Sequence, residues 1–405
     1  MSRVEEVRLR LVYDSRGKET VEATVKTDRG VLGIVSAPSG ASTGAHEVQA
    51  FPPGGVAEAL RVGTSILRPK LVDRDVEDQA GFDRTLHEVD GTPTFSRIGG
   101  NTATALSVAL AMARANEQGI DLARSLGAPE RPTRWPAVVG NTMNGGRHAI
   151  GGPDFQEFIA FAPDATPAEE VRAALAVHQA IGEEIHRRLP THALGRGDEG
   201  GWVAPIGNVV ALEILDAACA RVRDATHRKV FPGLDLAASE FFRDGAYRYQ
   251  DRTLDLDGQI AFVAELVDAH GIRYLEDPLD EEEFDGFARL TAAVGSKCLV
   301  VGDDLYTTRR DRLATGIAKR SSNAILIKVN QVGTLTDTLA TVALARASGL
   351  ETVVSHRSGD VPEGWLADLA VACGSAGLKC GLLGGERVAK LNELLRLGAA
   401  TEAPR

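Results

Sequence analysis

The spacing of apolar and polar positions divides the chain into two parts. In the first part, three runs rich in β-branched residues predict strands at residues 4–12, 21–27 and 31–36, with a tight turn at residues 28–30. From residue 56 to residue 116 the apolar spacing becomes helical. We therefore predict an α+β domain over residues 1–130, which ends in a polar segment that contains two prolines.

Beyond Trp135, short apolar runs alternate with amphipathic segments. Apolar residues at Val332, Leu335, Leu339 and Val342 have helical spacing, and the chain after Leu397 is expected to fray. Alternating strands and helices over residues 131–405 predict a mainly parallel sheet, closed into an α/β barrel, with an open doubly wound sheet as the alternative. The strands are predicted at residues 273–276, 298–302, 324–328, 352–356 and 378–379.

Six polar residues each lie at the end of a predicted strand, and after the first two they are spaced by one strand-helix unit. Because strand ends converge on one face of a parallel barrel, we expect the six side chains to share one pocket. A single acid in such a place would more often cap a helix or lie in solvent. The six residues are Asp235, Glu276, Asp303, Lys328, His356 and Lys379.

Three of these residues, Asp235, Glu276 and Asp303, supply only carboxylate oxygens, the ligands that suit Mg²⁺. The alternative is an ion-pair network with Lys328 and Lys379, but three converging carboxylates would repel one another without a cation. A lysine beside a metal ion loses its proton more easily, so one of the two lysines is the predicted base.

Composition restricts the possible partners. The formal net charge of −11 argues against general binding to nucleic acid or to an anionic membrane, and an anionic substrate would need a local positive site. We expect a cytoplasmic protein, because no apolar segment has the length of a signal or membrane-spanning sequence. The four cysteines form no CxxC pair and are expected to be reduced and buried.

Ten motifs, in order, resemble those of the enolase family between about residue 14 and residue 396. They are DSRG (14–17), PSGASTG (38–44), NGGRHA (144–149), QEF (156–158), GDEGG (197–201), LDLAASEFF (234–242), EDP (276–278), GDDL (302–305), IKVNQVGTLTDT (327–338) and SHRSG (355–359). The resemblance implies an enolase-type modified TIM barrel with an N-terminal cap domain that carries a mobile lid loop. It also implies a homodimer or higher homo-oligomer.

The resemblance further implies a role for each matched residue. Two Mg²⁺ ions are expected per site: Asp235, Glu276 and Asp303 would bind the first, and Ser42 would help bind the second together with the substrate phosphate. Lys328 would take the C2 proton of 2-phosphoglycerate. Glu199, supported by Glu157 and His148, would protonate the leaving C3 hydroxyl. The expected substrate contacts are Ser42, His356, Arg357, Ser358 and Lys379.

The sequence also departs from the family pattern. The segments after the lid and after LDLAASEFF are short, and Arg147 replaces a small residue before His148. If Arg147 points inward, it could bind a second anion on the substrate. The alternative function is then that of a specialised relative, carboxyphosphonoenolpyruvate synthase, which joins an enolpyruvate unit to phosphonoformate in phosphonate biosynthesis. A non-catalytic binding or scaffold protein with the same fold is a third possibility.

Overall fold

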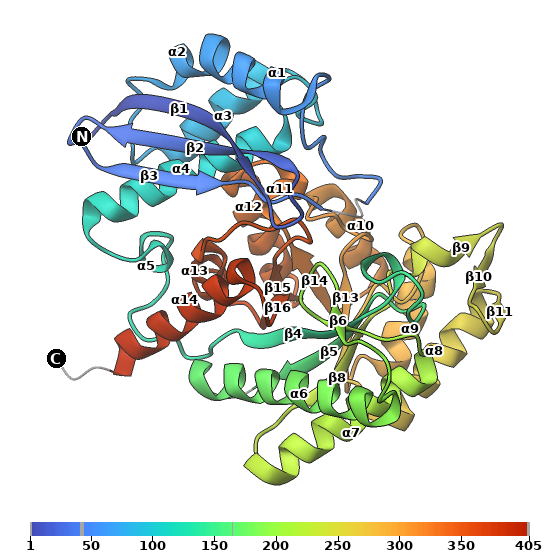
Figure 1. Ribbon diagram of the computed structural model, residues 1–405. Helices are drawn as coiled ribbons and strands as arrows, with labels where there is room; N and C mark the ends of the chain where they lie inside the picture. Colours follow the sequence, from blue (N-terminus) through green and yellow to red (C-terminus); the bar gives the residue numbers. More distant parts are fainter. Residues whose placement is uncertain (1, 41–43, 164, 403–405) are drawn as a thin grey trace.

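A three-stranded antiparallel sheet forms the N-terminal part of the computed structural model, which describes residues 2–40, 44–163 and 165–402 (Figure 1). Its strands, in spatial order, are β1 (Val4–Tyr13), β2 (Glu19–Thr27) and β3 (Leu32–Ser36). Gly30, with φ of 80°, makes the predicted turn between β2 and β3. Helices cover one face of this sheet: α1 (Gly55–Val62), the π-helix η1 (Gly63–Leu67), α2 (Arg68–Leu71), α3 (Gln79–Asp90) and α4 (Gly100–Gln118).

Helix α4 lies directly against β2 and β3. Its residues are almost all buried, as expected for a helix with apolar or small residues on every side. At Gly33 the backbones of β3 and α4 come so close that a Cβ atom would lie 2.0 Å from the carbonyl oxygen of Ala109. Glycine is therefore required at this position by contact with a neighbouring backbone.

An eight-stranded closed barrel forms the second part, below the N-terminal sheet in Figure 1. All neighbouring strands are parallel except at β5, and the pairing of β16 with β4 closes the barrel. The order is β4 (Ala137–Asn144), β5 (Glu157–Ala162), β8 (Phe231–Asp235), β12 (Tyr274–Glu276), β13 (Leu299–Gly302), β14 (Ala324–Ile327), β15 (Glu351–Ser355) and β16 (Gly377–Gly381).

Strand β5 runs antiparallel to both of its neighbours, β4 and β8. The connection from β4 to β5 is a loop with only the short 3₁₀-helix η2 (Gly146–His148), and no crossover helix carries the chain back to the other end of the barrel. As a result, the first residue of β5, Glu157, pairs with the last residue of β8, Asp235. Because β5 is reversed, its first residue lies at the same end of the barrel as the last residues of the parallel strands.

Side chains that point into the barrel form a hydrophobic core of their own, distinct from the larger core under the helices. Alternate strand residues point inward, as expected for a barrel of eight strands. The inner cluster consists of Ala137, Val139, Ile159, Phe161, Tyr274, Val301, Ala324, Leu326 and Val353. The residues between them, such as Val138 and Leu275, belong to the larger cluster under the helices. The pocket therefore opens at one end of the barrel, above a packed interior.

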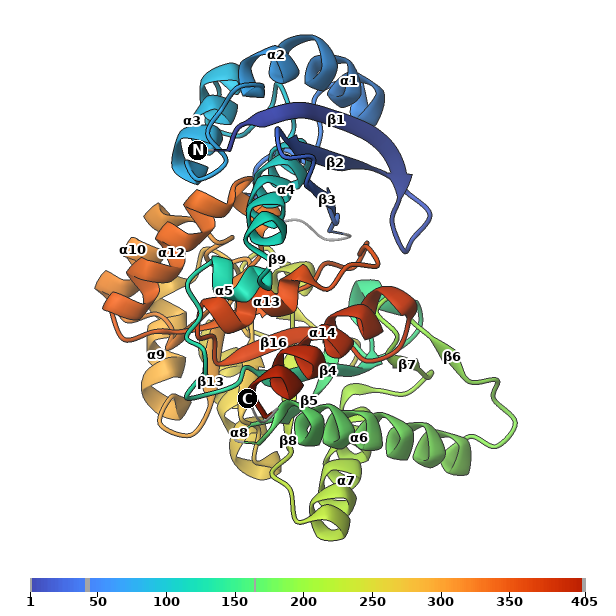
Figure 2. The same cartoon turned by 90° about the vertical axis from the view of Figure 1, so that its left-hand side faces the viewer.

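The barrel helices lie outside the strands, as the view in Figure 2 shows for α6 and α14. They are α6 (Pro167–Arg188), α7 (Asn208–Thr226), α8 (Leu256–His270), α9 (Phe284–Val294), α10 (Arg310–Lys319), α12 (Leu335–Ala347), α13 (Trp365–Ala372) and α14 (Gly385–Glu402). The short helix α11 (Val329–Val332) follows Lys328 and packs against α4. The short helix α5 (Leu122–Ser125) precedes β4, and the boundary predicted at residue 130 falls in the connection between them. No helix among the described residues is both long and apolar enough to cross a membrane.

Two short sheets extend from the barrel. The ribbon β6 (Gly195–Arg196) and β7 (Trp202–Val203) holds the GDEGG segment between its strands, and β7 joins the edge of β4. After β8, the 3₁₀-helix η3 (Ala238–Phe241) leads into β9 (Phe242–Arg243), β10 (Ala246–Arg248) and β11 (Thr253–Leu254). The connection that looks abbreviated in the sequence thus folds into a three-stranded antiparallel sheet.

Two local expectations are wrong. Val332 ends α11 and is separated from α12 by Gly333, with φ of 92°, and by Thr334, whose side chain caps α12. The chain after Leu397 does not fray within the described residues, because α14 continues to Glu402. The four cysteines are buried and free, as predicted.

The close approach at Gly33 predicts a loss of stability on substitution. We expect Gly33→Ala to lower the free energy of unfolding by about 1–3 kcal/mol, because the new methyl group overlaps the backbone of α4. The matched control is Gly195→Ala, since nothing lies within 4 Å of a Cβ atom at that exposed position. Equal free energies of unfolding for the two variants in urea would contradict this explanation.

Candidate active site

Ten predicted site residues line one pocket at the end of the barrel where β8, β12, β13, β14 and β15 finish. They are His148, Glu157, Glu199, Asp235, Asp303, Lys328, His356, Arg357, Ser358 and Lys379. Glu276 lies fully buried against Lys379 and belongs to the same group. Lys379 is not at a strand end as predicted: β16 continues to Gly381, and Lys379 reaches the pocket from within the strand.

The Lys379 ammonium stands among three carboxylates. Its Nζ atom is 2.7 Å from Glu276, 2.9 Å from Asp235 and 3.2 Å from Glu157. Strand pairing sets this arrangement, because Asp235 is in register with Glu276 on one side and with Glu157 on the other. The second lysine, Lys328, pairs with Asp303 on the next strands of the barrel.

The three carboxylates around Lys379 outnumber the single positive charge among them. Burial, together with the neighbouring Asp235 carboxylate, raises the pKa of Glu276 to about 8, although Lys379 opposes the shift. Burial and the nearby Glu199 carboxylate also raise the pKa of Glu157 well above its usual range. Burial opposes protonation of Lys379, but its carboxylate neighbours hold its pKa well above the ordinary value. One ammonium is not enough to keep all three carboxylates ionised.

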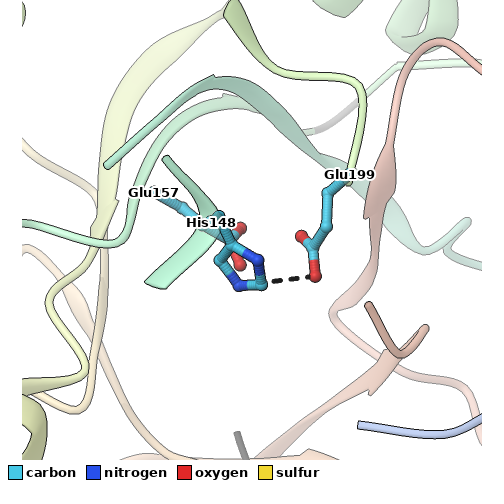
Figure 3. Close-up of side chains that lie close together, drawn as sticks. All are labelled: His148, Glu157 and Glu199. Atoms are coloured by element: carbon cyan, nitrogen blue, oxygen red, sulfur yellow. Dashed lines mark ion pairs between the residues drawn. The ribbon is translucent and has the colours of Figure 1, made fainter. Parts of the chain in front are cut away.

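Glu199 lies on the other side of the pocket, between two histidines. It comes from the β6–β7 ribbon, and Figure 3 shows it facing His148, with Glu157 beside them. His148 Nε2 is 3.6 Å from Glu199 Oε1, and His356 Nε2 is 3.2 Å from Glu199 Oε2. Asn141 donates a hydrogen bond to Oε2 at 3.0 Å.

The two histidines differ in charge preference. Burial opposes the charged form of His148, but the Glu199 and Asp198 carboxylates raise its pKa above the ordinary value, and Asp198 accepts from its Nδ1 at 2.7 Å. Burial lowers the pKa of His356 to about 4 and outweighs the effect of Glu199. A proton shared with Glu199 therefore belongs on the His148 side, while His356 stays neutral near pH 7.

Arg357 is held by a carboxylate that the sequence reading did not single out. Its guanidinium makes two hydrogen bonds to Glu47, at 2.9 and 3.0 Å, and one to Asn330 at 2.8 Å. Both Arg357 and Glu47 are almost fully buried. Glu47 lies in the shortened segment after the lid motif, so this ion pair joins the N-terminal part of the chain to the barrel pocket.

Two family models match this chain: "Enolase, N-terminal domain" over residues 4–126 and "Enolase, C-terminal TIM barrel domain" over residues 133–403. The enolase of Methanothermobacter thermautotrophicus is 46% identical over 402 residues, which cover 97% of this chain and 96% of the relative. The enolase of Thermoplasma acidophilum is 42% identical, with 97% and 98% covered. That of Methanocorpusculum labreanum is 44% identical, with 98% and 99% covered.

The chain belongs to the enolase family. It is therefore an enzyme of the enolase superfamily, a carbon-oxygen lyase. The expected fold class, a modified TIM barrel with an N-terminal cap domain, is confirmed. The family implies use of a divalent metal ion, which raises the question of which side chains could hold it.

Two groups of described side chains bring ligand atoms within 4.8 Å of one another: His148, Glu157 and Glu199, and Asp277, Asp303 and Asp304. The predicted ligands Asp235, Glu276 and Asp303 do not form either group, and the Lys379 ammonium stands between Asp235 and Glu276. Asp277 already accepts the backbone N–H groups of Asp303 and Asp304. Asp235 and Glu276 also offer carboxylate oxygens, which suit a divalent cation, and the raised pKa of Glu276 indicates that a positive charge would be favoured beside them.

Arg147 does not point into the pocket of this enolase-family chain. Its side chain is 55% exposed and pairs with Glu240 of η3 at 2.5 Å. The turn at η2 places Arg147 outward and the next residue, His148, inward. The expectation of an inward Arg147 that contacts substrate is therefore not met in this structure. Ser42 lies outside the described residues.

The pKa of His356 predicts an acid-dependent loss of stability. The folded chain keeps His356 neutral down to about pH 4, whereas in the unfolded chain its pKa returns to about 6.5. Between these values the unfolded state binds more protons. His356 therefore contributes stability above pH 6.5 that is lost as the pH falls towards 4, by about 3 kcal/mol in total.

The test compares the native chain with His356→Gln, which cannot titrate. Urea unfolding at several pH values between about 7 and 5 should show the native chain losing stability relative to the variant as the pH falls. Parallel pH dependence of the two free energies would show that His356 does not carry this effect.

Proposed function

We propose that this enzyme removes water from 2-phosphoglycerate to give phosphoenolpyruvate. The observation that carries the proposal is that one pocket holds a lysine beside buried carboxylates and, separately, a carboxylate flanked by two histidines. Removal of a proton and expulsion of a hydroxyl group need a base and an acid at two adjacent carbons. The three relatives named above are enolases, which supports the same reaction.

We assign the proton removal to Lys328. In this structure burial opposes its charged form, but Asp303 holds the pKa of Lys328 above its usual value. If Asp303 held a metal ion, its stabilisation of the Lys328 ammonium would weaken, and the neutral amine could accept the C2 proton. Lys379, Asp235 and Glu276 then share the side of the pocket that receives the substrate carboxylate.

The proposed metal ion is Mg²⁺, held by Asp235, Glu276 and Asp303, all of which offer hard oxygen ligands. When bound, it supplies positive charge that offsets the negative charge formed on the substrate carboxylate. The expected role of Ser42 at a second ion stays a prediction of the family resemblance.

Burial raises the pKa of Glu199, but the histidines beside it hold that pKa well below its usual range. We therefore assign delivery of the proton to the leaving C3 hydroxyl to Glu199 as a relay that receives the proton from its partner His148. Glu157, whose pKa is raised by burial and by the Glu199 carboxylate, lies beside this pair. Arg357 offers the planar donor fork that suits a phosphate group, and Ser358 lies next to it at the pocket wall. A phosphate would have to share Arg357 with Glu47, which already orients the guanidinium.

The alternative function, addition of an enolpyruvate unit to phosphonoformate, rested on the short segment after the lid and on an inward Arg147. Its pairing with Glu240 at the surface gives that alternative no support. A homodimer and a cytoplasmic location stay predictions. The N-terminal sheet does leave the apolar side chains of Leu32 and Ile34 in β3 exposed on one face, which could be buried between two copies.

The assignment of base and acid predicts different losses for two variants. Lys328→Ala should lose exchange of the C2 hydrogen of 2-phosphoglycerate in D₂O with Mg²⁺. Glu199→Gln should keep this exchange and lose formation of phosphoenolpyruvate by about 100-fold or more, because proton removal precedes loss of the hydroxyl. Proton NMR follows the exchange, and absorbance follows the product. Loss of exchange in Glu199→Gln alone would reverse the assignment.

The choice between the two lyase-family reactions is tested with phosphorus NMR. We expect full conversion of 2-phosphoglycerate to phosphoenolpyruvate with no new signal when phosphonoformate is added. We also expect Arg147→Ser to retain this activity, because the side chain lies outside the pocket. A phosphonate ester signal with release of free phosphate, abolished in Arg147→Ser, would instead support the synthase.

A further inference from the structure

Arg387 is fully buried behind the pocket and is absent from the lining of the proposed site. It lies in the first turn of α14, and its guanidinium reaches the turn formed by residues 356–358 from the side opposite the substrate space. A buried guanidinium is costly unless its donors are used. Its partners therefore indicate what it does.

The guanidinium nitrogens of Arg387 contact backbone carbonyl oxygens in two separate segments of the chain. One nitrogen is 2.6 Å from the carbonyl oxygen of Arg357, and the other is 2.7 Å from that of Ser358 and 3.1 Å from that of Asp198. Asp360 balances its charge at 3.1 Å. Asp198 precedes Glu199, so Arg387 connects the loop that carries the acid to the turn that carries His356.

The contact with His356 determines where the histidine carries its hydrogen. Arg387 approaches Nδ1 at 2.6 Å, and the backbone N–H of Gly381 approaches the same atom at 3.3 Å. A guanidinium and a backbone N–H have donors only, so Nδ1 must be the acceptor. The hydrogen of the neutral ring is then on Nε2, which lies 3.2 Å from Glu199 Oε2.

We propose that Arg387 is a positioning residue that fixes His356 as the Nε2–H tautomer and so sets which oxygen of Glu199 exchanges the catalytic proton. Asn141 donates a hydrogen bond to Oε2, and His356 Nε2 lies 3.2 Å from the same oxygen, so Oε2 acts as an acceptor. Oε1, which faces His148 at 3.6 Å, is left to take up and release the proton. The assignment of Oε1 rests on the proposed function of Glu199 as the acid. The assignment of the His356 tautomer does not depend on that function.

The test is nitrogen-15 NMR of the full chain with Mg²⁺ at pH 7, with labelled histidine rings. The His356 signals are assigned by their loss in His356→Gln. We expect a neutral ring with hydrogen on Nε2 and a bare, hydrogen-bonded Nδ1. A charged ring or an Nδ1–H tautomer in the native protein would overturn the proposal, whatever the activity of the enzyme.

Two variants separate positioning from a merely structural role. Arg387→Met removes the donors, and we expect a mixture of tautomers and a fall in kcat of about 10–100-fold with little change in KM. Asp360→Asn is the matched control, because it weakens the ion pair with Arg387 but leaves the Arg387 N–H donors in place. We expect His356 to keep the Nε2–H tautomer in this variant. A folded Arg387→Met protein that keeps the Nε2–H tautomer and the native kcat would contradict the proposal.

Discussion

The ammonium of Lys379, surrounded by three buried carboxylates, is the interaction on which the rest of the pocket depends. Each of these charges would cost several kcal/mol if it were buried alone. Together they are tolerated because a closed barrel holds them in register, and they still leave an excess of negative charge, visible in the raised pKa of Glu276. An excess of negative charge of this kind is the electrostatic condition under which a divalent cation is favoured.

The reversed strand β5 connects this charge cluster to the acid group. Because Glu157 begins β5 opposite Asp235, one carboxylate faces Lys379 and lies beside the pair of Glu199 and His148 at the same time. With a helical crossover in place of the loop after β4, β5 would run parallel to its neighbours, and its first residue would lie at the far end of the barrel. The loop also carries His148, so one departure from parallel topology supplies two residues of the pocket.

Much of this could be predicted from the sequence, because side chains at strand ends follow from topology alone. Asp235, Glu276, Asp303, Lys328 and His356 lie where the strand pattern put them. The outward turn of Arg147 and the pairing of Glu47 with Arg357 depend on loop geometry and on contacts across domains, which a strand-helix pattern does not contain. Arg387 was missed for a related reason: it lies on a helix, and only its burial behind the turn at residues 356–358 reveals its contacts.

The most direct test of the account is a crystal structure of the enzyme soaked with Mn²⁺, with anomalous diffraction used to locate the metal. We predict an ion bonded to Asp235, Glu276 and Asp303, with the Lys379 ammonium displaced from its position between Asp235 and Glu276. An ion bound instead by His148, Glu157 and Glu199, or by Asp277, Asp303 and Asp304, with Lys379 still joining its carboxylates, would contradict it.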